Sequence, residues 1–184
     1  MEATDILKTE HRVIERVLLA LETAAQRAEQ GQAVRPGFFL EGADFIKGFA
    51  DGCHHHKEEG VLFKEMVAAG MPQNGGPVGV MLSEHEEGRG YTRAMREAAA
   101  KWQAGETGAR SAVIAAARDY AGLLRQHIQK EDNILYPMAQ QVIPPKVQTR
   151  LVSDFEHVEH EETGPGVHEK YLALAEKLQK EMGL

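Results

Sequence analysis

Two segments of this chain align without a gap. The first is HHHKEEGVLF, from His54 to Phe63, and the second is HIQKEDNILY, from His127 to Tyr136. His127 follows His54 by 73 positions, and a second pair, Thr9-Glu10-His11 and Ser83-Glu84-His85, recurs after 74. Chance similarity rarely keeps such an interval, so the chain is predicted to be internally duplicated, with two matching halves in its fold.

The elements of both halves are predicted to be helices. Stretches dense in Ala, Leu, Glu, Lys, Gln and Arg are separated by short Gly/Pro clusters, and no alternating β-branched run indicates a strand. The breaks fall at residues 30–37, 70–79, 104–108 and 143–145. They predict an all-α chain of five helical segments in one domain, residues 1–184, with a bundle at about 3–142 and a C-terminal helical extension at about 146–184. Gly164-Pro165-Gly166 divides the extension, which favours two helices packed outside the first four, and Pro137 leaves open whether the fourth segment kinks or ends early.

Three of the segments carry apolar stripes at helical spacing, and each stripe contains a histidine. The stripes are Leu7, His11, Ile14, Leu18, Leu21 and Ala25; Val78, Leu82, His85, Thr92, Met95 and Ala99; and Tyr120, Leu124, His127, Glu131, Ile134 and Met138. Histidines are therefore expected inside the bundle.

A histidine and a glutamate four residues apart lie on one face of a helix, one turn from each other. Two such pairs and two further stripe histidines bring four imidazoles and two carboxylates into one core. Without a metal this would be costly, because buried polar groups that lack partners destabilise a fold. Histidine and carboxylate without thiolate favours iron or manganese over structural zinc, and six ligands from four helices favour two ions.

The order H, HxxxE, H, HxxxE between about Ile6 and Ala139 resembles the hemerythrin-like HHE cation-binding family, as do Leu62-Phe63 and Leu135-Tyr136-Pro137. The resemblance implies an up-down-up-down four-helix bundle. It also implies a non-haem di-iron centre with bridging glutamates, in which zinc or manganese can substitute for iron. The ligands it implies are His11, His54, Glu58, His85, His127 and Glu131.

Two departures from the oxygen-carrying hemerythrins bear on function. Those carriers place a second histidine one turn after the third-helix ligand, where this chain has Arg89, and an Asp five residues after the last histidine, where this chain has Glu131 after four. The pattern is nearer to bacterial relatives that handle iron, nitric oxide or peroxide. We therefore expect a protein that binds or reacts with O2, peroxide or nitric oxide, with peroxidase-like or nitric-oxide-related redox activity as one form of that function. The alternative is an iron or oxygen sensor, or an iron donor, that acts through a partner without turnover.

Several residues near these motifs have two interpretations. His55 with Glu59 has the same spacing as His54 with Glu58, and the duplication favours the latter pair. Acids that directly follow a bridging carboxylate, Glu59 and Asp132, are expected to face solvent. Arg89 either holds a bound anion or, as we favour, pairs with a carboxylate such as Glu15. The extension histidines, His157, His160 and His168, either lie on a solvated acidic face or hydrogen-bond to the metal centre.

Charge and targeting signals narrow the partners. Lys and Arg total 21 against 28 for Asp and Glu, so the formal net charge of −7 opposes binding to nucleic acid. The single Cys53 suits a reducing compartment, and neither a secretory signal nor an apolar stretch long enough for a bilayer stands out. We expect a cytoplasmic protein whose partner is a small diatomic molecule or peroxide, without nucleic acid or membrane.

Overall fold

The computed structural model describes residues 2–184, which form six continuous helical rods and no strand. The first rod is α1 (Ala3–Glu29). The second joins α2 (Pro36–Phe45), the π-helical stretches η1 (Ile46–His55) and η2 (Glu58–Leu62), and α3 (Phe63–Ala68). The third is α4 (Pro77–Gln103), and the fourth joins α5 (Ala109–Lys130), π-helical η3 (Glu131–Leu135) and α6 (Tyr136–Val142). The last two are α7 (Pro145–His157) with π-helical η4 (Val158–Thr163), and α8 (Val167–Glu181).

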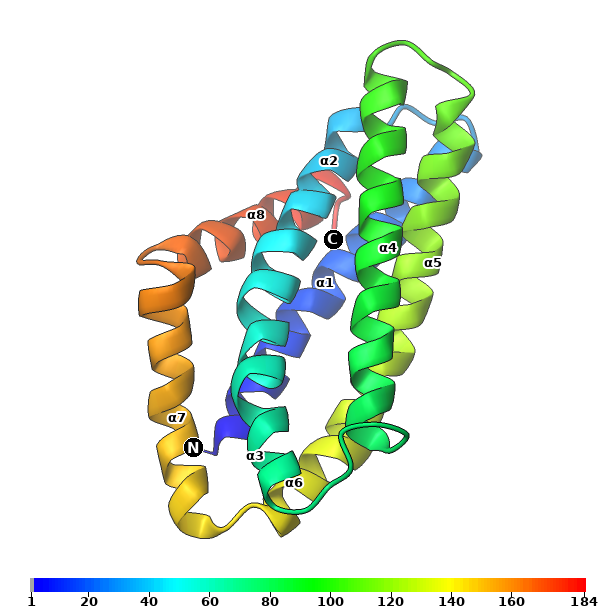
Figure 1. Cartoon of the computed structure of the whole chain (residues 1–184). Helices are drawn as coiled ribbons and strands as arrows, with labels where there is room; N and C mark the ends of the chain where they lie inside the picture. Colours follow the sequence, from blue (N-terminus) through cyan, green and yellow to red (C-terminus); the bar gives the residue numbers. More distant parts are fainter. Residues whose placement is uncertain (1) are drawn as a thin grey trace.

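The first four rods form an up-down-up-down bundle (Figure 1). Short loops make successive rods antiparallel, and α5 returns to pack against α1, which closes the bundle. α7 packs against α1 and η2, and α8 crosses over α1 and α2. The predicted all-α bundle with an added helical segment is confirmed. No helix within residues 2–184 combines the length and the apolar character that a membrane span needs.

A polar layer divides the apolar core into two clusters. One cluster contains Ile14, Leu18 and Phe49, and the other contains Leu7, Leu62 and Leu135. Between them lie the buried histidines and glutamates of the predicted motifs. Apolar packing holds the four rods together at both ends of this layer, so the backbone positions of the polar side chains are set from above and below.

Three of the four π-helical stretches lie at or beside the predicted ligands. A π-helical turn contains an extra residue, which rotates everything that follows relative to an α-helix. Downstream of Glu131, the rotation buries Leu135 and Tyr136 and leaves Ile134 54% exposed. The prediction that Ile134 continues the buried stripe is therefore wrong. Pro137 lies in the first turn of α6, where a missing backbone donor costs least, and the rod continues to Val142.

The C-terminal extension forms the two predicted helices and contributes to both core clusters. Leu151 and Phe155 enter one cluster, and Leu178 enters the other. Tyr171 packs so closely over Gly48 that a Cβ at that position would lie 1.9 Å from the ring. Gly164 ends the fifth rod at a φ of 106°, a conformation that favours glycine. The extension is thus packed against the bundle as part of one core.

Candidate metal centre

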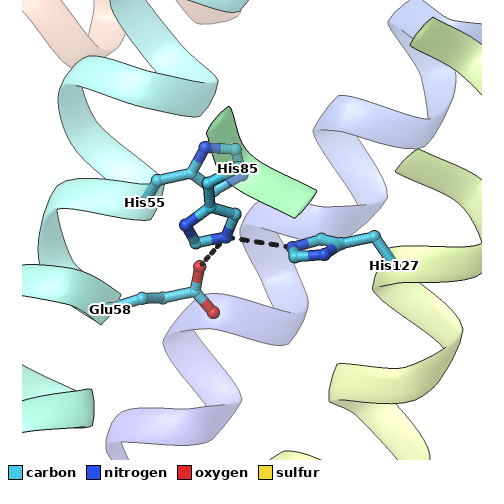
Figure 2. Close-up of side chains that lie close together, drawn as sticks. All are labelled: His55, Glu58, His85 and His127. Carbon is cyan, nitrogen blue, oxygen red and sulfur yellow. Dashed lines mark hydrogen bonds and ion pairs between the residues drawn. The ribbon is translucent and has the colours of Figure 1, made fainter. Parts of the chain in front are cut away.

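Two clusters of buried side chains in the polar layer have the composition of metal sites. The first cluster is His11, His54, Glu58 and Glu131, and the second cluster is His55, Glu58, His85 and His127. Within each, the potential ligand atoms lie within 4.8 Å of one another. Figure 2 shows the second cluster, with Glu58 and His127 both directed toward His85. Glu58 belongs to both clusters, so the two form one continuous centre.

All six residues predicted as ligands meet here. The two glutamates lie between the halves of the centre. Glu131 reaches His11 on one side and His127 on the other, each with a nitrogen to oxygen distance of 3.1 Å. Glu58 lies 3.7 Å from His54 and 3.4 Å from His85. Both carboxylates are therefore placed to contact ions on either side.

The seventh residue of the centre is His55, which the sequence offered as an alternative to His54 and which the structure brings in beside it. Its ring stacks on that of His85, with centroids 3.9 Å apart, and it is almost fully buried. Neighbouring residues of an α-helix point about 100° apart. His54 and His55 are nevertheless both buried in the bundle, as are His127 and Ile128 at the matching positions of α5. The duplication gave no sign that His55 joins the centre, because Ile128 stands at the matching position of the second half.

The polar atoms at the middle of the centre lack partners. His54 Nε2, His55 Nε2, Glu58 Oε2 and both carboxylate oxygens of Glu131 are buried without a hydrogen bond from any residue in the described range, 2–184. Such atoms are costly in a protein core unless something binds them. Five imidazoles and two carboxylates that converge on one another suit transition-metal cations. The residues present therefore fit metal ions.

The outer nitrogens of the clustered histidines are held by acids, and the arrangement follows the duplication. His54 Nδ1 donates to Glu10, and His127 Nδ1 donates to Glu84, both at 2.9 Å. Each acceptor directly precedes a predicted ligand, His11 or His85. Such hydrogen bonds fix the tautomer of a ligand histidine and increase its basicity.

The acids that follow the bridging glutamates have the same role. His85 Nδ1 donates to Glu59 at 2.7 Å, and His11 Nδ1 donates to Asp132 at 2.8 Å. The expectation that these acids face solvent is wrong, because the π-helical turns direct them across the bundle to a neighbouring rod. Their presence at matching positions of both halves was a signal that sequence reasoning could have used.

Arg89 and His55 add contacts that only the second cluster has. Arg89 pairs with Glu59 at 2.6 Å and so supports the acceptor of His85. Arg89 therefore pairs with carboxylates, as favoured, but Glu15 is not among them, since Glu15 pairs with Arg12 one turn away. His55 Nδ1 donates to Asp51 at 2.9 Å.

Charge within the centre shifts the pKa of its histidines in opposite directions. Burial favours the neutral ring, but the hydrogen bond with Asp132 and the negative charges of Glu131 and Glu58 outweigh it and raise the pKa of His11 to about 9. Burial is likewise outweighed at His127, where the charge of Glu131 raises the pKa to about 10. At His55, burial and the neighbouring cationic rings lower the pKa well below its usual value. The buried carboxylates thus attract positive charge into the centre.

The inner faces of the two clusters differ. Tyr136 donates its hydroxyl hydrogen to Glu58 at 2.7 Å and lies 3.2 Å from His11 Nε2. At the matching position of the first half stands Phe63, whose ring stacks on His85. The first cluster therefore has two histidines and a phenol, and the second has three histidines and a phenyl ring.

The remaining histidines lie outside both clusters. His157 and His160 are exposed, and His56 pairs at the surface with Glu162 at 2.7 Å. His168 lies on α8 with its Nδ1 3.8 Å from the sulfur of Cys53. None of the extension histidines contacts a histidine of the centre.

Comparisons with known proteins agree with this description. The family model for the hemerythrin HHE cation binding domain matches residues 2–139. An uncharacterized protein of Mycobacterium bovis and uncharacterized proteins from two strains of Mycobacterium tuberculosis are each 22% identical to this chain over 182 residues. The matched regions cover 99% of this chain and 71% of each relative. No solved structure gives a significant match.

Proposed function

The chain belongs to the hemerythrin HHE cation-binding domain family, and we propose that it is a non-haem di-iron protein that binds or reacts with a small oxidant such as O2, peroxide or nitric oxide. This function would serve oxidative or nitrosative stress responses or iron handling. The observation that carries the proposal is the set of buried, unpartnered nitrogen and oxygen atoms in two clusters that share Glu58.

The donor set supports iron and a count of two. Histidine with carboxylate and without thiolate is typical of non-haem iron sites. Cys53 stays outside both clusters, and burial raises the pKa of its thiol to about 12. Each cluster offers four residues, and Glu131 extends from the first toward His127 of the second. Two ions bridged by Glu58 and Glu131 would satisfy every orphaned atom of the ligand residues.

The difference between the clusters indicates where a small molecule would bind. The first cluster offers two ring nitrogens and the second offers three, so the first leaves more room for a ligand from solution. Two ferrous ions, when bound, supply electrons that a small oxidant can accept. Tyr136 places a hydroxyl donor beside His11 and Glu58, and the two apolar clusters keep bulk water from the polar layer.

The test is anaerobic loading with ferrous iron, followed by exposure to air, peroxide or nitric oxide. We expect close to two irons per chain and charge-transfer absorption after oxidation, with faster consumption of one of these oxidants than free iron gives. A chain that binds no iron, or only one zinc ion, would contradict the proposal. Steady-state peroxide consumption separates an enzyme from a protein that only binds its ligand.

A sensor or iron donor is the second candidate, because η4 of the extension packs on η1, which carries His54 and His55. A ligand that binds only the folded form stabilises it. Proteolysis of the extension is therefore expected to be slower in the iron-loaded protein than in the metal-free protein. Equal digestion of both forms would exclude this role.

A further inference from the structure

Lys57 lies at the boundary between the bundle and the C-terminal extension and has no exposure to solvent. Its ammonium donates to Glu10 at 2.5 Å and to Glu159 of η4 at 2.8 Å. Glu10 also accepts the hydrogen of His54 Nδ1. A chain of charge-assisted hydrogen bonds therefore runs from the extension to a residue of the first cluster.

The second half of the bundle has the same arrangement without its outer member. Lys130 pairs with Glu84, which accepts from His127, but the Lys130 side chain is 37% exposed. Water therefore shares its charge, whereas Lys57 depends on two carboxylates. Together, Glu10, Lys57 and Glu159 carry a formal charge of −1, and Glu84 with Lys130 carries none.

Glu10 and Glu159 also form a group with Cys53 and His168. The potential ligand atoms of these four residues lie close enough together to hold a metal ion. The ammonium of Lys57 already donates to both carboxylates of that group, and a second cation there would be repelled. The group is better explained as a structural connection that terminates at His54.

The position of Glu159 is set by packing around it. Phe155 and Val158, which precede it, are buried, and Thr163 donates to the carbonyl oxygen of Gly52 at 3.1 Å. These contacts hold η4 against η1. Glu159 lies outside residues 2–139, the region that the family model matches.

We propose that Glu159 is a positioning residue of the metal centre, which acts on His54 through Lys57 and Glu10. Shared between two carboxylates, Lys57 draws less charge from Glu10, and Glu10 is then a stronger acceptor for the His54 ring. A more basic ring binds a metal ion more tightly and stabilises its oxidised state. The proposal rests on the proposed function, since it requires a metal beside His54.

The test compares Glu159→Gln with Glu162→Gln in the full-length protein loaded with ferrous iron. Glu162 lies on the same η4 stretch and pairs with exposed His56, so its replacement removes the same charge without touching Lys57. We expect E159Q to bind one of two ferrous ions about tenfold more weakly and to raise the reduction potential of the centre. We expect E162Q to match the unmodified protein in both measurements.

A double-mutant cycle with Glu10→Gln shows whether the effect travels through Glu10. If it does, E159Q changes iron affinity and reduction potential less in the E10Q background than alone. Additive effects in the cycle would overturn the proposal, and so would identical behaviour of E159Q and E162Q. Absence of iron from the unmodified protein would instead overturn the proposed function, while a lower melting temperature of E159Q with an unchanged potential would assign Glu159 a purely structural role.

Discussion

The two halves of the metal centre have matching outer contacts and different inner ones. In both halves, an acid beside a ligand of one rod accepts a hydrogen bond from a histidine of another rod. On the inner side, His55 and Phe63 of the first sequence repeat occupy the positions that Ile128 and Tyr136 occupy in the second repeat. The shared part orients the imidazoles, and the divergent part makes the two clusters unequal, so these two features are set by separate residues.

The largest effect is expected when the carboxylate shared by the two clusters is removed. Glu58→Ala removes the carboxylate common to both, so we expect the loss of both metal ions, as measured by metal analysis per chain. Glu65→Ala is the matched control, because Glu65 lies on the same rod and pairs only with Arg150 at the surface. Circular dichroism checks that both variants keep their helices. Retention of two ions by E58A would mean that Glu58 is not a shared ligand.

The two clusters contain different numbers of histidines, and replacing one histidine in each cluster tests that difference. His54→Ala leaves the first cluster with one histidine, and we expect it to lower the metal content from two ions to one. His55→Ala leaves the second cluster with two histidines, so we expect two ions at saturation, with one bound about tenfold or more weakly, since even an outer hydrogen-bond partner has that effect. Isothermal titration separates the two cases. Unchanged affinity in H55A would make His55 a core residue without a metal.

The pH dependence of metal binding tests a feature common to both clusters, a histidine with a raised pKa. Burial lowers the pKa values of His11 and His127, but nearby carboxylates raise them to about 9 and about 10. Below these values both rings hold a proton that a metal ion must displace, so affinity rises with pH and levels off above them. The first cluster contains one such histidine, and in the second the pKa of His85 is raised as well as that of His127, so we expect at least about one proton released per ion at neutral pH. Calorimetry in buffers of different ionisation enthalpy measures this number, and zero release would contradict the prediction.

The smallest effect concerns Tyr136 and its counterpart Phe63. Tyr136→Phe removes a buried hydrogen bond to Glu58, and we expect the metal-free protein to lose about 1.5–3 kcal/mol in free energy of unfolding. Denaturant unfolding in the presence of a chelator measures it. Phe63→Leu is the comparison, since it keeps an apolar side chain in the other half and leaves Glu58 bonded. A larger loss in F63L than in Y136F would show that packing, not the hydrogen bond, distinguishes these positions.

The bundle and six residues of the centre could be predicted from the sequence, because the duplication and the helical stripes carry that information. The duplication set His55 aside because Ile128, at the matching position, has no ligand atom. Ile134 was misplaced because the π-helical turn of η3 changes the phase of the helix without a recognisable residue pattern. The partner of Arg89 depended on which rods lie beside α4, which only the packed structure shows. The role of Glu10 and Glu84 was readable from the repeat itself.

The residues of the two clusters extend along the chain from His11 to Glu131 and come from all four rods of the bundle. A nascent or truncated chain that ends before η3 has no Glu131, and its first cluster is incomplete. Neither cluster has its full set of residues until the fourth rod has packed in the bundle, because that rod supplies Glu131 to the first and His127 to the second. Metal bound at both clusters in a preparation of this protein would indicate that synthesis and assembly of the bundle were complete.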